Sequence, residues 1–510
     1  MQKTSLLILL SFFYYYGISN AQNVNQLNNR CDTVNNLSEI KGVLLDMATG
    51  KPLPYANIFV LHKHTGTISN ENGNYLLNIN GLKKTDTVRF KYVGYADKNF
   101  TIAELDSIST VYLNENIFNL DEILVFGSAP DARTIVKKIV ENIDSNYLKS
   151  TCKKQMFIRE RYTSDLIDFK LNYKKSSIPD IDKAMIAQIE NKIPKHSTSY
   201  SDFLGNFYFS SLKDDSVSLK IDPVKSVALK EKDFAEIDKI ISVFEEEFKN
   251  TGEGEYWKVR TGIFSQKLDL AGDTAGVLSD TINKNRIKLE YFRKRLFFQL
   301  KYPSLKNKDY WEFLYKTGRY KYTIAGGTRV NGEDVYIIDF EPDNSGMYRG
   351  RMYVSVETYA LIRADYQYAP GKTGTDFHLF GVGYTENLFY GSIYFEKRNG
   401  RYKLKYFSKK AGALANFDRK VLLVKKKERF LFDKTLNELK TGIELTVNTV
   451  QLFECLVLDD EPVPEKVFDG FNEKEYMNII YVDKFDDSLW KGYAIIEPTR
   501  QMRDYRKHND

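Results

Sequence analysis

The residues best suited to metal chemistry in this chain are few and scattered. Its five histidines are His62, His64, His196, His378 and His508. A zinc peptidase needs a His-x-x-Glu pair and a distant third ligand, and none of the five has a glutamate at that spacing. His62 and His64 would share one face of a strand, but Lys63 and Thr65 indicate an exposed strand end with no third ligand nearby. The sequence therefore predicts no metal site.

Other motifs that would support catalysis are incomplete. Gly371-Lys372-Thr373 is similar to part of a phosphate loop, but Tyr366 occupies the position of the first glycine, so we interpret it as a turn. No Gly-x-Ser-x-Gly elbow, dinucleotide fingerprint or EF-hand loop occurs. Glu245-Glu246-Glu247 fits the solvated side of a helix. A glycosidase pair among the 68 acidic residues stays open, because the spacing that matters is spatial. We assign no catalytic or cofactor-binding residue and no cofactor, and predict a protein that is not an enzyme.

The amino-acid composition limits which classes of partner are expected. The 510 residues carry 74 basic and 68 acidic side chains, a balance that argues against nucleic acid. The run Lys425-Lys426-Lys427, within Arg419 to Arg429, fits a solvated strand or loop, with anionic lipid or polysaccharide as the alternative. Aromatic residues make up 14% of the chain, including 35 Tyr, which suits carbohydrate or lipid binding but is also expected of strands.

The three cysteines, Cys31, Cys152 and Cys455, cannot form a disulfide framework or a zinc ribbon. A bridge between Cys152 and Cys455 is conceivable in an oxidising periplasm, but free buried thiols are the preferred interpretation.

The beginning of the chain predicts export. Residues 1–21 have the basic start, apolar centre and small-residue end of a signal peptide, and residues 22–38 form an Asn-rich flexible leader. No later run is long and apolar enough for a transmembrane helix. We expect secretion across the inner membrane and a location in the periplasm or at the outer membrane.

Residues 39–126 predict a small β-sandwich. Apolar and polar residues alternate around Val88, Phe90 and Tyr92, and again around Tyr75 and Leu77. Turn chemistry separates the runs: Thr49-Gly50, Pro52 to Pro54 and Asn72-Gly73. We expect a seven-stranded type of antiparallel sandwich.

The same stretch resembles a known family. It contains the segments Lys41 to Asp46, Thr49 to Val60, Gly66 to Leu77, Phe90 to Tyr95 and Leu120 to Val125. These are similar to the carboxypeptidase-regulatory-like domain, a transthyretin-like sandwich common in cell-envelope proteins of Bacteroidetes-type bacteria. The resemblance implies an envelope location and a module without catalytic activity of its own.

A linking helix is predicted over residues 127–150. Ser128 is a cap candidate, Pro130 presets φ and Asp131 supplies a first-turn acid. Apolar residues then follow one helical face: Ile135, Val136, Ile139, Val140, Ile143 and Tyr147.

Residues 151–510 predict a sheet-rich domain of unknown function. Helical spacing occurs between Pro179 and Pro194 and from Phe234 to Phe248, and from Lys258 onward strand alternation dominates. The order of strand and turn around Gly350 to Ile362 looks similar to the curved sheet of periplasmic lipoprotein carriers, which implies an acyl-binding concave face. Phe485 to Pro498 resembles the tail of secreted Bacteroidetes proteins that carry the same sandwich.

The fold class expected is thus mainly β: a sandwich, a linking helix and a larger antiparallel curved sheet with a few helices. The function expected is a non-enzymatic binding or scaffold protein of the cell envelope, with an envelope protein, a glycan or a lipid as partner. Two alternatives stay open: a lipid or lipoprotein carrier that uses the curved sheet, and a secreted hydrolase with an unrecognised carboxylate site.

Overall fold

The computed structural model describes residues 39–63, 65–118, 131–147, 150–211, 217–229, 248, 250–262, 264–268 and 285–505. Predictions for the signal peptide, the leader, His64, His508, Ser128, Pro130, Cys31, the 234–248 helix and Glu245-Glu246-Glu247 lie outside these residues or almost entirely so.

The N-terminal sandwich has the seven strands expected, in two sheets around a core of its own. One sheet has the order β4-β1-β7 and the other β3-β2-β5-β6. The strands are β1 (Glu39–Asp46), β2 (Asn57–Val60), β3 (Gly66–Ile68), β4 (Asn74–Asn78), β5 (Thr87–Lys91), β6 (Lys98–Thr101) and β7 (Thr110–Leu113), with the short helix α2 (Ile102–Leu105). The expectation of a purely antiparallel sandwich was wrong in one pair: β1 and β7 run parallel, because the chain crosses from the other sheet before β7 forms.

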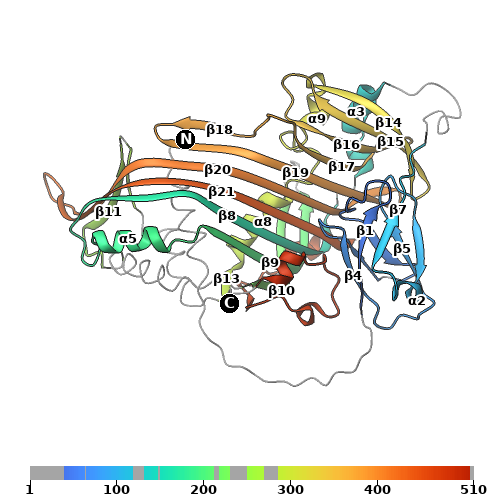
Figure 1. Ribbon diagram of the computed structural model, residues 1–510, viewed down its shortest axis with the longest axis horizontal. Coiled ribbons are helices and arrows are strands. Elements are labelled where there is room, and N and C mark those ends of the chain that lie inside the picture. The colour runs from blue at the N-terminus through green and yellow to red at the C-terminus, as the bar shows by residue number, and fades with distance from the viewer. Residues whose placement is uncertain are drawn as a thin grey trace.

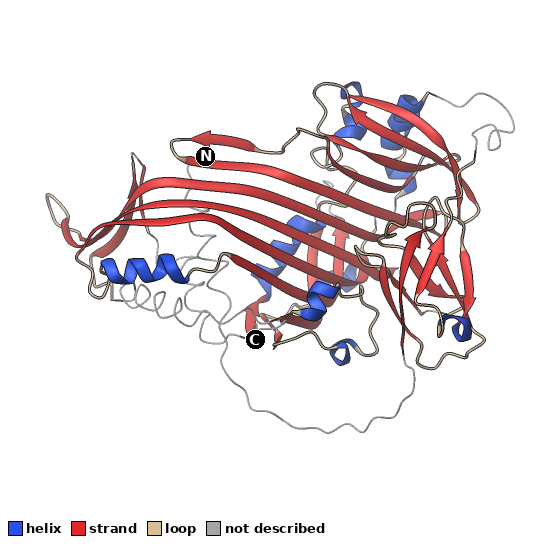
Figure 2. Cartoon of the chain, viewed as in Figure 1, coloured by secondary structure: helices blue, strands red, loops and turns tan. Residues whose placement is uncertain are grey.

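The described residues after the sandwich build one mainly antiparallel sheet of fourteen strands. The sheet is curved, as Figures 1 and 2 show. Its main path has the order β14-β15-β16-β17-β19-β20-β21-β8-β9-β10-β23, while β11, β12 and β18 pair beside it. The strands are β8 (Cys152–Ser176), β9 (His196–Ser211), β10 (Val217–Leu229), β11 (Glu255–Thr261), β12 (Phe264–Lys267), β14 (Tyr320–Val330), β15 (Glu333–Pro342), β16 (Tyr348–Ser355), β17 (Leu361–Tyr368), β18 (Asp376–Leu379), β19 (Val382–Arg398), β20 (Arg401–Lys427), β21 (Lys434–Pro462) and β23 (Ile480–Val482). A separate pair joins β13 (Arg286–Lys288) to β22 (Tyr476–Asn478).

The long strands β8, β20 and β21 carry the sheet away from the sandwich (Figure 1). β20 runs without a break from Arg401 to Lys427, because no turn residue interrupts its pairing with β21. The sheet therefore has two ends with different surroundings.

The helices are α3 (Ala132–Glu141), α4 (Ile143–Asn146), α5 (Lys183–Lys192), α8 (Leu289–Leu300), α9 (Glu312–Tyr315), α10 (Glu465–Gly470) and α11 (Arg500–Asp504), with 3-10 turns η3 (Thr317–Arg319) and η4 (Asp487–Trp490). The predicted linking helix is confirmed as α3 and α4, and the helix predicted near 181–193 as α5. Asp131 is the N-cap of α3 rather than a first-turn residue, because its carboxylate accepts a hydrogen bond from the Thr134 amide. Helix α8 was missed within the strand-rich region.

Each face of the sheet near the sandwich buries a different core. Along β8, Met156 and Ile158 join the core under α3, α8 and α9, whereas Phe157 joins the core under the C-terminal tail. In the stretch of β16 and β17 that resembles the carrier sheet, the apolar side chains Met352, Val354 and Ile362 are at most 2% exposed and packed into the first core. That part of the sheet is therefore filled by the protein's own side chains.

Candidate functional site

The C-terminal tail, residues 485–505, joins the sandwich to the sheet. Trp490 and Ile496 share a core with Tyr55 of the sandwich and Phe157 of β8. Two sandwich side chains also hold the tail backbone: Thr67 Oγ1 donates to the Ile495 carbonyl at 3.2 Å, and Asn70 Nδ2 to the Glu497 carbonyl at 3.0 Å. We call this region, where tail, sandwich and sheet meet, the junction.

A buried ion pair lies under the tail. The register of the sheet places Arg159 of β8 opposite Asp202 of β9, on the face that the tail covers. Arg159 Nε and Nη2 donate to the two Asp202 carboxylate oxygens, each at 2.7 Å, and Nη1 donates to the Ile496 carbonyl at 2.6 Å. Since Arg159 and Asp202 are 3% and 1% exposed, one guanidinium fixes both a neighbouring strand and the tail.

Glu454 of β21 lies beside this pair without a cation of its own. It is opposite Arg159 in the register, but the guanidinium of Arg159 serves Asp202, and that of Arg161 serves Glu71 of the sandwich at 2.6 Å. Burial, together with the negative charge of Glu71, raises the pKa of Glu454 to about 7, against the opposing effect of the two arginines. Glu454 is 2% exposed, and Tyr406, which stacks on Tyr55 with ring centroids 4.3 Å apart, covers it.

A second group of charged side chains holds the tail together and links it to the sandwich. Arg503 of α11 donates to Glu497 at 2.7 Å and to Asp487 at 2.9 Å, and Lys41 of the sandwich lies 3.2 Å from the same Asp487 carboxylate. Burial raises the pKa of Glu497, although Arg503 opposes this effect. Two carboxyls with raised pKa values thus occur in this region, and both are held within a packed contact.

The sandwich makes one more anchored contact, on β17. Arg363, 3% exposed, pairs with Asp365 at 2.7 Å, donates to the Tyr92 hydroxyl at 2.7 Å and lies over the Tyr92 ring. A small pocket between Tyr55, Lys91, Tyr92 and Arg363 borders this contact. The sandwich is therefore held against the sheet by two buried arginines, Arg159 through the tail and Arg363 directly.

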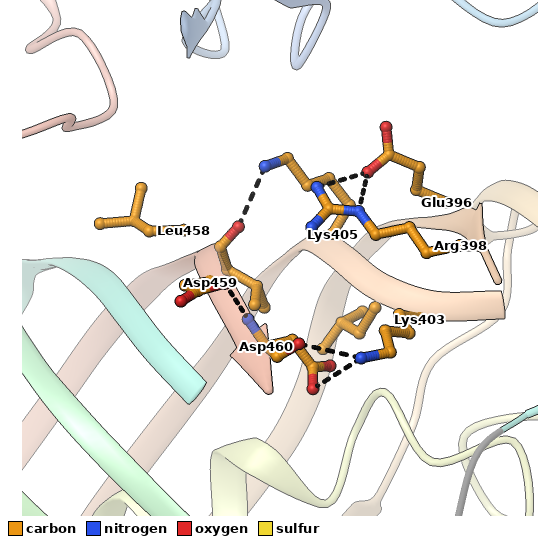
Figure 3. A pocket seen from close by; sticks show the side chains of 9 residues that line it. Glu396, Arg398, Lys403, Lys405, Leu458, Asp459 and Asp460 are labelled. Atoms are coloured by element: carbon orange, nitrogen blue, oxygen red, sulfur yellow. Dashed lines mark hydrogen bonds and ion pairs between the residues drawn. The ribbon is translucent and has the colours of Figure 1, made fainter. Parts of the chain in front are cut away.

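A further pocket lies where the β19–β20 turn approaches β21 (Figure 3). Charged side chains line it, but they pair with one another: Arg398 with Glu396 at 2.8 Å, and Lys403 with Asp460 at 3.3 Å. Lys405 Nζ donates to the Val457 carbonyl at 3.1 Å, and burial lowers its pKa. The pocket offers few unpaired groups to a ligand.

The residues singled out from the sequence are not brought together. The idea of a strand face shared by His62 and His64 was wrong, because His62 lies in a turn with φ of 62°, outside β2 and β3. His196 contacts Asp165 at 2.6 Å and His378 contacts Asp376 at 3.3 Å, both at exposed positions. Gly371 and Lys372 lie in a turn closed by a hydrogen bond from the Lys372 amide to the Ala369 carbonyl, and Thr373 follows it. The described part of the chain contains no group of three side chains arranged to hold a metal ion.

Cys152 and Cys455 are buried and free, which confirms the preferred interpretation over a bridge between them. Cys455 Sγ instead lies 3.8 Å from the Met156 sulfur, inside the core.

Sequence reasoning missed the junction residues. The available signal in the sequence was a pair of charged residues, Arg159 and Glu160, directly after the apolar residues Phe157 and Ile158. Charges inside an apolar run indicate either an edge or a buried pair, and the partner cannot be found without the fold.

Comparisons with known proteins agree with the sandwich. Residues 40–125 match the model of the CarboxypepD_reg-like domain, which confirms the resemblance drawn from the sequence. No curated protein matches the chain. Among the described residues, no helix is long and apolar enough to cross a membrane.

Solved structures give only distant matches. Two are complexes of MucB with MucA, one described as containing MucA(peri) and one from Pseudomonas aeruginosa, at 10% and 8% identity. They cover 62% and 63% of this chain and 94% and 93% of theirs, each with a TM-score of 0.17, which is too low to support a common fold. The family established by these comparisons is thus that of residues 40–125, a CarboxypepD_reg-like domain.

Proposed function

We propose that this protein is a non-catalytic binding or scaffold protein of the cell envelope, exported across the inner membrane to the periplasm or the outer membrane. The signal-like segment 1–21 and the CarboxypepD_reg-like sandwich support the location. The partner proposed is another envelope component.

The observation that carries the proposal is the burial of Glu454. It is the described carboxyl whose pKa is raised to about 7, the property expected of a general acid or base. A catalytic acid must reach its substrate, yet this side chain is 2% exposed beneath the tail and the sandwich. Its neighbours Arg159 and Arg161 hold other elements in place. This carboxyl with a raised pKa thus lies within a contact between segments, as in a scaffold.

The test is affinity capture from envelope extract with the protein from Gln22 onward as bait. We expect one stoichiometric component that survives a salt wash and binds again when both proteins are purified. Trp490→Ala, which loosens the junction, serves as the comparison bait. It should capture less of a component that binds to the sandwich and the sheet together.

The hydrolase alternative has its own readout. Turnover of glycan, peptide or ester substrates by the wild type, lost in Glu454→Gln, would contradict the scaffold proposal. Stoichiometric acyl lipid without a protein partner would favour the carrier alternative instead.

A further inference from the structure

The turn between β20 and β21, residues 428–433, exposes three consecutive apolar side chains. Phe430, Leu431 and Phe432 are 102%, 78% and 86% exposed, more than any other large apolar side chain that the structure describes. The turn stands at the far end of the long strands, away from the sandwich (Figure 1, far left). We call these three side chains the apolar tip.

Basic residues surround the apolar tip. The segment from Lys425 to Lys434 contains five basic and two acidic residues. Lys427, Arg429 and Lys434 are exposed, and no ion pair joins any of them to an acidic group among the described residues. These three cations can therefore reach toward an anionic surface.

The two acids of the segment are already engaged. Glu428 pairs with Lys267 at 2.8 Å, and the Asp433 carboxylate accepts a hydrogen bond from the Tyr256 hydroxyl. The side chains that would repel an anionic surface are thus held by β11 and β12, at the base of the turn.

Backbone hydrogen bonds support the β20–β21 turn up to its first residue, Glu428. β11 pairs with β20 from Val421 to Lys427, and the Glu428 amide donates to the Gly254 carbonyl at 2.8 Å. Beyond Glu428 the apolar side chains project past the sheet. A paired hairpin therefore presents a small, exposed apolar end flanked by basic residues.

A tip of this shape fits a bilayer better than a protein. A stable protein interface buries about 800 Å² on each partner, which three side chains on a convex turn do not supply. Aromatic and leucine side chains favour the boundary between lipid headgroups and acyl chains, and neighbouring Lys and Arg side chains bind anionic headgroups. The three apolar side chains of this tip contribute nothing to the core. Without a partner, their exposure to water is unfavourable.

We propose that the β20–β21 turn is a membrane-docking tip: Phe430, Leu431 and Phe432 insert into the headgroup boundary of an anionic bilayer, and Lys427, Arg429 and Lys434 contact the lipid phosphates. This inference rests on the proposed envelope location. It is separate from the proposed capture of a partner from envelope extract.

The test is cosedimentation of the protein from Gln22 onward with vesicles of phosphatidylcholine containing phosphatidylglycerol, compared with phosphatidylcholine alone. We expect binding to the anionic vesicles that weakens at high salt. The triple variant F430S/L431S/F432S should lower the partition coefficient about tenfold or more, because it removes the inserted area. Neutralising the cations in K427Q/R429Q/K434Q should abolish the preference for anionic vesicles.

Phe298→Ser is the matched control, because Phe298 is 66% exposed on α8, away from the tip. It should bind as the wild type does. Equal circular dichroism spectra and denaturation midpoints ensure that the variants are folded. Failure of the wild type to bind either vesicle, or unchanged binding by the triple serine variant, would overturn the proposal. Pelleting of the wild type without vesicles, abolished by the triple variant, would assign the tip to self-association instead. None of these outcomes alters the expected capture of a partner from envelope extract.

Discussion

Strands β20 and β21 pass through two different surroundings, about 65 Å of strand apart between Glu454 and Lys434. At the junction, the face of the sheet is charged and fully covered, and each buried charge except Glu454 has a specific partner. At the tip, the side chains are apolar and uncovered, and the charges around them face solvent.

The difference teaches how to interpret polar and apolar residues in this fold. A charge buried at the junction is unfavourable unless a partner of opposite charge lies in good geometry. The paired residues therefore fix how three segments fit together. Exposure of apolar groups at the tip has no such compensation within the chain. The first pattern is that of an internal structural contact, and the second is that of a contact with something outside the protein.

Breaking the buried pair should give the largest effect. Arg159→Ala leaves the Asp202 carboxylate buried without a cation and removes a donor to the Ile496 carbonyl. We expect the free energy of unfolding to fall by about 3–5 kcal/mol, measured by urea denaturation.

The exposed pair of Lys175 and Glu438 provides the control. Lys175→Ala should cost about 0–1 kcal/mol, because solvent screens that pair. The double variant R159A/D202A should recover part of the loss, and equal effects of Arg159→Ala and Lys175→Ala would remove the distinction between buried and exposed charge.

Removing the tail's main anchor should rank second. Trp490 is 3% exposed and contacts the Phe157 ring edge to face, with centroids 5.3 Å apart. Trp490→Ala should cost about 3 kcal/mol. Limited proteolysis should then cut the tail faster than in the wild type. Tyr493→Ala, at a 41% exposed neighbour, should leave the cleavage rate nearly unchanged.

Local patterns explain which parts of the fold were predictable. Tyr336, Ile338 and Phe340 alternate in sequence and form β15, and the apolar face of Ile135 and Ile139 forms α3, because neighbouring residues determine both. The length of β20 was not predictable, because pairing with β21, rather than any local signal, carries it from Arg401 through Gly412 to Lys427.

The candidate site was predictable only in fragments. Arg159, Asp202 and Glu454 come from three strands, and only the register of the sheet brings them opposite one another. A single polar residue in an alternating run predicts a solvated face, which is wrong here because the tail covers that face. The basic run at Lys425 was visible in the sequence, but the exposure of Phe430 to Phe432 beside it required the structure.

The pH dependence of stability tests the role of Glu454. In the unfolded chain this carboxyl ionises near its ordinary value of 4.5, whereas in the folded protein it holds its proton to about pH 7. Stability from this group is therefore complete below pH 4.5 and is lost as the pH rises toward 7. Glu454→Gln should match the wild type near pH 4.5 and exceed it by about 3 kcal/mol at pH 8.5.

Urea denaturation at both pH values measures this difference. Glu444→Gln, at a more exposed carboxylate of the same strand, controls for the substitution of glutamate by glutamine. A Glu454→Gln variant that is less stable than the wild type at pH 8.5 would mean that Glu454 is ionised and paired in the folded protein.

The tip should give the smallest effect on stability. Since Phe430, Leu431 and Phe432 bury almost nothing, their replacement by serine removes no packing, and the free energy of unfolding should change by less than about 0.5 kcal/mol in the absence of lipid. With anionic vesicles present, the wild type should gain stability by mass action and the triple variant should not, because only the wild type binds the membrane in its folded state. Denaturation with and without vesicles measures both quantities on the same samples. A loss of several kcal/mol without lipid would show that the tip packs against the chain in solution and would remove the contrast with the junction.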